Sequence, residues 1–189
     1  DRFQRENPNC EIWPVLKSNA YGHGLELVTE ILKARKPSYL IVDSYFEALK
    51  IRKINPGQKI LIIGSIQPEN FRRMNFRNLA LMIQDKQSLN ELRKINKNVP
   101  IHLKVNTGMN RQGFDVDEMP NIEVEGIFSH IASDKTAKKQ LEIFEKSLKY
   151  MPQYRHIYAT ESSKIIKDPI LNAMRLGIGL YDGALKFKA

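Results

Sequence analysis

The chain has 189 residues, with 30 Lys and Arg against 21 Asp and Glu, a formal net charge of +9 and a hydrophobic fraction of 42%. This length and apolar content predict one soluble globular domain and exclude intrinsic disorder, and the longest apolar runs, such as Ile60 to Ile63, are too short to span a membrane. The single cysteine, Cys10, excludes an internal disulfide framework, and the first residues lack the apolar core of a signal peptide, so a cytoplasmic location is expected. The positive charge leaves a nucleic-acid partner open.

Short apolar runs alternate along the chain with longer amphipathic stretches, which indicates strands alternating with helices. Strands are expected at Ile12 to Lys17, Tyr39 to Asp43, Lys59 to Gly64, Leu79 to Gln84, Ile101 to Val105, Val124 to Ser129, His156 to Thr160 and Ala173 to Tyr181. Helices are expected at Leu25 to Ala34, Tyr45 to Lys53, Pro68 to Asn75, Lys86 to Ile95 and Thr136 to Tyr150, with weaker ones near Asp117 and Ser162.

Eight strand and helix units joined by right-handed crossovers favour a closed (β/α)₈ TIM-type barrel, of the α/β class, over an open sheet. Such barrels usually have about 250 residues, so the chain is short for one. Residues 184–189 alternate apolar and basic side chains and are expected to begin a strand. The predicted organisation is therefore a barrel domain over 1–183 and, at 184–189, the first strand of a C-terminal β domain.

The catalytic residues of a barrel come from the carboxyl ends of its strands and from the loops that follow. Lys17 closes the first expected strand and precedes a polar loop, Ser18-Asn19-Ala20-Tyr21-Gly22-His23-Gly24. A lysine in this place either extends its amine to solvent at the barrel rim or forms a Schiff base with an aldehyde. The isolated lysine does not decide between the two.

Four segments of the chain resemble segments of the alanine racemase family, and they occur in the same order as in that family. They are Val15-Leu16-Lys17-Ser18-Asn19-Ala20-Tyr21-Gly22-His23-Gly24, His102-Leu103-Lys104-Val105-Asn106-Thr107-Gly108-Met109-Asn110-Arg111, Gly126-Ile127-Phe128-Ser129-His130 and Arg175-Leu176-Gly177-Ile178-Gly179-Leu180-Tyr181. The resemblance covers the N-terminal barrel domain of that family. It implies pyridoxal 5'-phosphate as cofactor, alanine as substrate and the interconversion of L-alanine and D-alanine, which supplies D-alanine for peptidoglycan.

The resemblance implies that Lys17 holds the cofactor as an internal aldimine and then moves the α-proton of the substrate on one face. The cofactor phosphate would be bound by a tyrosine, a threonine, and backbone N–H groups after a late strand: Tyr21, Thr160, Gly177 and Ile178. Thr160 is placed there by its spacing from Arg175, although the local Tyr158-Ala159-Thr160-Glu161 departs from the usual Asn-Ser-Ala pattern of the family. Tyr21 could instead be a structural tyrosine of the core or rim.

Arg175 corresponds to the arginine that faces the pyridine nitrogen in the family. A guanidinium can only donate a hydrogen bond, so the ring nitrogen would stay unprotonated, which disfavours transamination. The alternative is a structural arginine paired with an acid at the barrel end.

Arg111 resembles the arginine that contacts the phenolic oxygen of the cofactor and positions the substrate carboxylate. Lys104 corresponds to a position that is often a carbamylated lysine orienting this arginine, although an unmodified buried lysine fits the sequence equally well. Asn106 replaces a more frequent Asp. His130 would lie beside the cofactor ring, and His156 would belong to the hydrogen-bonded shell of Arg175. The four histidines show no metal-ligand spacing, and no metal is expected.

Racemisation also needs a proton donor on the face of the α-carbon opposite Lys17. In the family this group is a tyrosine from the C-terminal domain of the partner subunit in a homodimer. The chain by itself is therefore expected to bind cofactor and to racemise poorly.

Three other functions stay open on the sequence. A single-domain pyridoxal-phosphate homeostasis protein shares the cofactor, but the loop after Lys17 and the segment Met109-Asn110-Arg111 argue against it. A serine or broad-specificity amino-acid racemase fits the same residues. A basic nucleic-acid-binding module would need clustered basic residues with interleaved aromatics, whereas the basic residues here are scattered over helix faces. No nucleic-acid or membrane partner is therefore expected.

Overall fold

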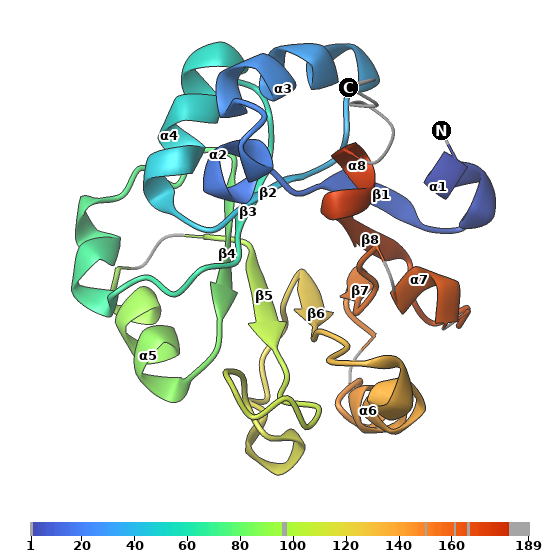
Figure 1. Cartoon of the computed structure of the whole chain (residues 1–189). Helices are drawn as coiled ribbons and strands as arrows, with labels where there is room; N and C mark the ends of the chain where they lie inside the picture. The colour runs from blue at the N-terminus through green and yellow to red at the C-terminus, as the bar shows by residue number, and fades with distance from the viewer. Residues whose placement is uncertain (1, 96–97, 150, 161, 166, 182–189) are drawn as a thin grey trace.

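The structure, a computed structural model, describes residues 2–95, 98–149, 151–160, 162–165 and 167–181. Within these described residues, eight parallel strands succeed one another (Figure 1). They are β1 (Glu11–Pro14), β2 (Leu40–Val42), β3 (Ile60–Ile62), β4 (Leu79–Ile83), β5 (Ile101–Lys104), β6 (Gly126–Phe128), β7 (Tyr154–His156) and β8 (Ala173–Leu176).

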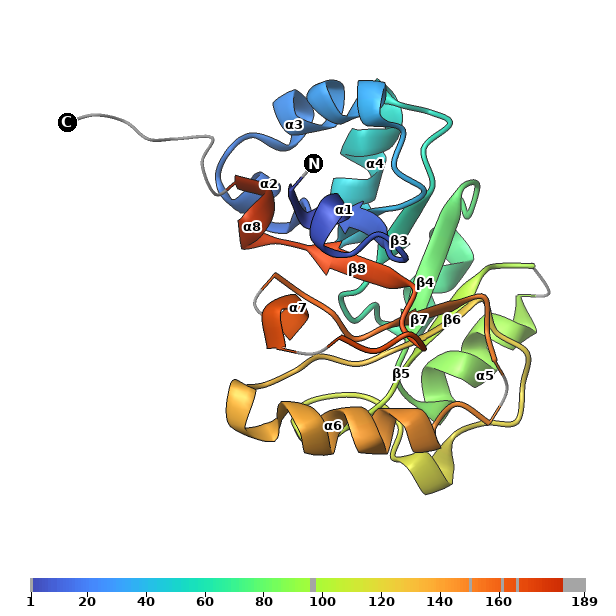
Figure 2. The ribbon, with the colours of Figure 1, turned by 90° about the vertical axis from the view of Figure 1, so that its right-hand side faces the viewer.

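Helices follow most of the strands, as the sequence pattern predicts, and one short helix precedes the first strand. The helical segments are α1 (Arg2–Glu6), α3 (Leu25–Leu32), α4 (Tyr45–Ile54), α5 (Lys86–Lys94), α6 (Asp134–Lys146), α7 (Ser162–Ile165) and α8 (Ile178–Tyr181), and α2 (Lys17–Tyr21) is a left-handed turn. Three 3₁₀ turns, η1 (Lys33–Arg35), η2 (Pro68–Arg73) and η3 (Val116–Glu118), complete the described elements. The pair α3 and α4 lies on one side of the strands and α6 on the opposite side (Figure 2).

The strands curl into a TIM-like barrel. Six of them pair in parallel in the order β2-β3-β4-β5-β6-β7, and β1 pairs in parallel with β8. Two isolated bridges join these sheets, one between Val15 and Ile41 and one between Tyr158 and Met174. The expected α/β barrel is therefore confirmed at the level of a TIM-like fold.

Alternate side chains of each strand pack into two separate cores, as the period of two along a strand requires. The outward set packs under the helices and includes Leu40, Val42, Ile60 and Ile62, all fully buried. The inward set fills the barrel and is rich in rings. It comprises Trp13, Val15, Tyr39, Ile41, Leu61, Ala80, Tyr154 and Ala173, and the imidazoles of His102 and His156 contact its rings.

The structure corrects several expected boundaries. The last strand ends at Leu176 instead of continuing to Tyr181, because the chain turns there into the short helix α8. The seventh strand, Tyr154–His156, starts two residues and ends four residues earlier than expected, and Tyr158 makes only an isolated bridge. The stretch after β3 forms the 3₁₀ segment Pro68–Arg73 instead of an α-helix. The strand expected at 184–189 lies outside the described residues.

An aspartate immediately before α5 stabilises the start of that helix. Asp85 caps α5, since its carboxylate accepts a hydrogen bond from the Ser88 N–H at 2.7 Å. Within the described part of the chain, no helix has both the length and the apolar character that a membrane span requires.

Candidate cofactor site

A cavity of about 740 Å³ opens at the carboxyl ends of the barrel strands. All but one of the site residues expected from the sequence line it. These are Lys17, Tyr21, Lys104, Arg111, His130, Thr160, Arg175, Gly177 and Ile178. The exception, His156, lies one layer deeper in the barrel and contacts Arg175. Segments that are more than 150 residues apart in the chain therefore meet at one site, as expected for a parallel barrel.

Lys17 lies beyond the first strand, which ends at Pro14, at the start of an unusual turn. Four consecutive residues there, Ser18 to Tyr21, have φ between 53° and 55°, in the left-handed region. For each residue other than glycine, this conformation costs about 1–2 kcal/mol. The polar loop expected after Lys17 is thus a single left-handed turn.

Hydrogen bonds hold this turn in place. The Ser18 N–H donates to Glu47 Oε1 at 2.7 Å, and the Leu25 N–H donates to Asn19 Oδ1 at 2.9 Å. The turn presents Lys17 to the cavity, where its Nζ lies 3.6 Å from Asp43 Oδ2. The amine is partly exposed and can be reached by a ligand in the cavity.

Tyr21 and Gly177 approach each other across the cavity. A methyl group added at Gly177 would lie 2.7 Å from the Tyr21 hydroxyl oxygen, so glycine leaves the room that this hydroxyl occupies. Nearby, the Thr160 hydroxyl accepts a hydrogen bond from the Gly179 N–H at 3.1 Å. Tyr21, Thr160 and the start of α8 therefore form one polar wall.

The guanidinium of Arg175 is buried and is fixed by hydrogen bonds to groups inside the barrel. Its Nη1 donates to His156 Nδ1 at 2.9 Å and to the His156 carbonyl at 3.0 Å, and its Nη2 donates to the Ser129 carbonyl at 2.6 Å. The guanidinium also lies over the Phe128 ring, 4.9 Å from its centroid. Burial lowers the pKa of Arg175. These contacts are with an imidazole and two backbone carbonyls, so they differ from the alternative of a structural arginine paired with an acid.

Basic side chains dominate a second wall of the cavity, which contains Lys104, Arg111 and His130. Burial, reinforced by Arg111 and Arg175, lowers the pKa of Lys104 to about 8, and its Nζ donates to Gln112 Oε1 at 2.8 Å. Burial together with the same cations lowers the pKa of His130 to about 4, so this imidazole is neutral at pH 7. The cavity thus favours an anionic ligand.

Sequence reasoning missed three groups that shape the cavity. Asp43 follows β2 and pairs with Lys17, Gln112 accepts the Lys104 hydrogen bond, and the Ser129 carbonyl accepts from Arg175. The position of Asp43 at the end of a strand was a usable signal, whereas a backbone carbonyl leaves none in the sequence. Among the described residues, no three His, Cys, Asp or Glu side chains gather as metal ligands would.

Known proteins match this chain along most of its length. The sequence profile of the family described as "Alanine racemase, N-terminal domain" matches residues 1–184. An alanine racemase of Staphylococcus carnosus (strain TM300) is 31% identical over 196 residues, covering 92% of this chain and 51% of that protein. An alanine racemase of Methanococcus maripaludis is 34% identical over 203 residues, covering 93% and 54%.

A solved alanine racemase from Clostridium difficile 630 superposes with a TM-score of 0.84 at 23% identity, covering 94% of this chain and 54% of that one, and so supports the fold. The chain spans about half the length of the curated relatives it matches. Profile, relatives and fold agree, and the chain belongs to the alanine racemase family through its N-terminal domain.

Proposed function

We propose that this chain provides the cofactor-binding barrel of an alanine racemase, which interconverts L-alanine and D-alanine and supplies D-alanine for peptidoglycan. Proteins of this family are pyridoxal phosphate enzymes. The observation that carries the proposal is the convergence of Lys17, Arg111 and Arg175 on one cavity at the carboxyl ends of the strands. A lysine supplies the amine for an aldehyde, and the arginines supply fixed positive charge for an anion.

The cavity fits pyridoxal phosphate on its own residues. Four basic side chains line it, Lys17, Lys104, Arg111 and Arg175, against two carboxylates, Asp43 and Asp134, and an anionic ligand would offset the excess of positive charge. The phosphate would lie at the polar wall, bound by the hydroxyls of Tyr21 and Thr160 and by the N–H groups of Gly177 and Ile178. The absence of a side chain at Gly177 supports this, because a Cβ there would meet the Tyr21 hydroxyl.

When bound, pyridoxal phosphate withdraws electrons from the amino acid joined to it and so makes the α-proton acidic. Lys17 would anchor the cofactor aldehyde through Nζ. Once displaced by the amino acid, the same amine would remove or return the α-proton on one face. Asp43, 3.6 Å from Nζ, lies close enough to orient the ammonium form.

Arg175 would donate a hydrogen bond to the pyridine nitrogen. Because a guanidinium keeps its protons, that nitrogen would remain unprotonated and the ring would withdraw electrons less strongly. This restraint favours return of the α-proton over transamination. The buried position of Arg175 and its three hydrogen bonds support a fixed donor of this kind.

Arg111 would contact the phenolic oxygen of the cofactor and the substrate carboxylate, and His130 would lie beside the ring. Lys104 would carry a carbamate that orients Arg111. The lowered pKa of Lys104 supports carbamylation, since the neutral amine is the form that reacts with CO₂. A carbamate would also place a negative charge among the cations of this wall.

The second acid or base, on the opposite face of the α-carbon, would come from outside this chain. We infer a homodimer in which the partner subunit's C-terminal domain provides it, with the barrel domain over 1–183 and a second domain that starts near 184. The length of the curated relatives, about twice that of this chain, supports a second domain in the parent enzyme.

Reductive trapping tests the cofactor and its anchor together. The protein is mixed with pyridoxal phosphate, its absorbance spectrum is recorded before and after borohydride, and the modified peptide is mapped. We expect a Schiff-base absorbance that borohydride abolishes and a label on Lys17, and a Lys17→Arg variant without label. A label on Lys104 or on surface lysines instead, or no label, would refute the proposal.

A further inference from the structure

A row of hydrogen bonds leads from Arg175 through the barrel to its opposite end. His156 Nδ1 lies 2.9 Å from Arg175 Nη1, and His156 Nε2 lies 2.8 Å from His102 Nδ1. His102 Nε2 lies 3.1 Å from Glu125 Oε2. Both imidazoles are fully buried, whereas the Glu125 side chain is 16% exposed at the amino end of β6.

The chemistry of the two end groups sets the direction of every proton in this row. A guanidinium only donates, so His156 Nδ1 accepts and the proton of His156 is on Nε2. That proton is donated to His102 Nδ1, which leaves the proton of His102 on Nε2. A carboxylate only accepts, so Glu125 receives it. Both histidines are therefore neutral Nε2–H tautomers, and reversing either one would set two N–H groups against each other.

Glu125 is the anion at the far end of this row. Within the described residues, Arg175 donates to an imidazole and to two backbone carbonyls, and no carboxylate pairs with it directly. Burial lowers the pKa values of His102 and His156, so neither carries charge at neutral pH. Burial by itself would raise the pKa of Glu125, but hydrogen bonds from His102 and Tyr39 outweigh it and keep this carboxyl ionised.

The barrel interior is shaped around these groups. Gly126 leaves space for the His102 ring, because a Cβ at this position would lie 2.3 Å from His102 Nδ1. The Tyr39 hydroxyl donates to the same oxygen of Glu125 at 2.6 Å. The His156 ring stacks on Phe128, with centroids 4.9 Å apart. A buried donor or acceptor that loses its partner is unfavourable, so the loss of one member of this row would leave a neighbouring group unsatisfied.

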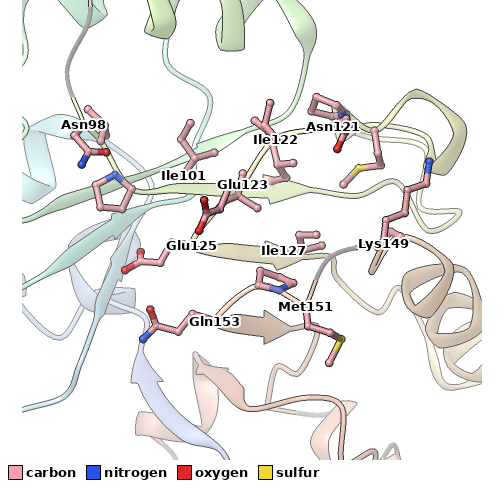
Figure 3. A pocket seen from close by; sticks show the side chains of 18 residues that line it. Asn98, Ile101, Asn121, Ile122, Glu123, Glu125, Ile127, Lys149, Met151 and Gln153 are labelled. Atoms are coloured by element: carbon pink, nitrogen blue, oxygen red, sulfur yellow. The ribbon is translucent and has the colours of Figure 1, made fainter.

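A second cavity, of about 1100 Å³, gives solvent access to the Glu125 end. Figure 3 shows its lining, with Glu123 and Glu125 on the segment that leads into β6. Glu123 is exposed and lines the same cavity. It therefore provides a matched control for a change of charge at this place.

We propose that Glu125 is a positioning residue for Arg175: as the terminal acceptor it fixes the tautomers of His102 and His156, and through them the orientation of the Arg175 guanidinium at the candidate site. This placement of protons stands on the geometry alone. Its consequence for the cofactor, a fixed donor to the pyridine nitrogen, rests on the proposed function.

Nitrogen NMR of the imidazoles tests the placement without cofactor. In the wild-type chain we expect both His102 and His156 as neutral Nε2–H tautomers from pH 7.5 to pH 6. A Nδ1–H tautomer at either residue, or an imidazolium within this range, would overturn the proposal. This measurement needs no variant, so it does not depend on whether a substitution folds.

Variants then test the dependence on Glu125. Glu125→Leu removes the acceptor, so we expect mixed tautomers at His102 and exchange of the Arg175 guanidinium protons with water at least tenfold faster, the factor that corresponds to about 1.4 kcal/mol. Glu125→Gln keeps an acceptor oxygen and should restore the wild-type tautomers, and Glu123→Gln should change neither quantity. Wild-type tautomers and exchange rates in Glu125→Leu would refute a positioning role.

Binding of pyridoxal phosphate separates this inference from the proposed function. We expect Glu125→Leu to weaken binding about five- to tenfold and to change the absorbance of the bound cofactor, with Glu125→Gln and Glu123→Gln within twofold of wild type. If the wild-type protein binds no pyridoxal phosphate, the proposed function fails while the NMR result still decides the proton placement. If Glu125→Leu shifts the tautomers but leaves cofactor affinity and absorbance unchanged, the functional consequence is wrong.

Discussion

Two lysines at the candidate site lie in contrasting surroundings. Lys17 is partly exposed and lies beside the carboxylate of Asp43. Lys104 is buried, with Arg111 and Arg175 close enough to disfavour its protonated form, and its pKa falls to about 8. A substantial fraction of Lys104 is therefore a neutral amine at slightly alkaline pH. The same residue type thus suits two tasks, an anchor for an aldehyde at 17 and an acceptor of CO₂ at 104.

Carbamylation of Lys104 can be detected directly. With ¹³C-labelled bicarbonate at pH 8, we expect a carbamate carbon resonance that disappears on acidification and is absent from a Lys104→Met variant. Lys135→Met, on the surface of α6, should retain the resonance. A spectrum without any carbamate signal at pH 8 would leave Lys104 an unmodified lysine bonded to Gln112.

At the scale of elements, the start of α4 supports the turn that carries Lys17. Ser44 and Glu47 form a capping box, in which the Glu47 N–H donates to Ser44 Oγ at 3.2 Å and Glu47 Oε2 accepts from the Ser44 N–H. The other oxygen of Glu47 accepts the Ser18 N–H. One carboxylate thus caps a helix and holds a left-handed turn.

Loss of this cap should reduce stability measurably. We expect Ser44→Ala to lower the free energy of unfolding by about 0.5–2 kcal/mol, because an N–H at the first turn of α4 loses its partner. Ser133→Ala is the control, since Ser133 precedes α6 without a side-chain cap bond, and a smaller loss is expected there. Urea denaturation of both variants compares them; equal losses would contradict the capping argument.

The turn from β8 into α8 is the element that makes Gly177 necessary. A Gly177→Ala variant would set a methyl group 2.7 Å from the Tyr21 hydroxyl oxygen, and one of the two must move. We expect pyridoxal phosphate to bind at least tenfold more weakly, measured by absorbance titration. Gly57→Ala, where a Cβ meets nothing within 4 Å, should bind as wild type does. Unchanged affinity in Gly177→Ala would place the phosphate elsewhere.

At the scale of the whole molecule, the partly buried His130 of the cavity makes stability depend on pH. The pKa of His130 is about 4 in the folded chain, lowered by burial and then by Arg175, Arg111, Lys104 and Lys17. In the unfolded chain it is about 6.5, so between pH 6.5 and pH 4 the unfolded state binds more protons. Stability contributed by neutral His130 is present above pH 6.5 and is lost as the pH falls through this window.

A His130→Asn variant isolates that contribution. The free energy of unfolding of the wild-type chain should fall more steeply between pH 6.5 and pH 4.5 than that of the variant, by up to about 1.4 kcal/mol per pH unit. Denaturation at several pH values gives both slopes. Parallel slopes would show that His130 titrates alike in the folded and unfolded states.

The barrel as a whole is expected to hold cofactor without completing racemisation. A proton donor on the second face contributes about 10²–10⁴-fold to such a step, and we place that donor outside this chain. The 189-residue chain should therefore racemise L-alanine at least about a hundredfold more slowly than a full-length alanine racemase at equal cofactor occupancy. Comparable rates in a coupled D-alanine assay would mean that this chain carries both proton donors.

Much of this architecture follows from patterns that are local in the sequence. The alternation of buried runs such as Leu79–Ile83 with amphipathic stretches such as Lys86–Lys94 predicts both the elements and their parallel arrangement. The residues expected at the cofactor were also found from local motifs, and they line one cavity. Their individual roles remain proposals.

Other features depend on contacts between distant residues, which a linear pattern does not contain. Ser18 to Tyr21 are ordinary L-residues in a left-handed turn. The turn is held from outside, because Glu47 of another helix accepts the Ser18 N–H and Asn19 of the turn accepts the N–H of Leu25. The sequence by itself indicated a TIM-like barrel and placed Arg175 in its last strand, but it did not predict that this strand ends at Leu176. That Arg175 is joined to Glu125 through two neutral histidines was decided only by the tertiary structure, because hydrogen-bond partners are set by where side chains from β5, β7 and β8 meet inside the barrel.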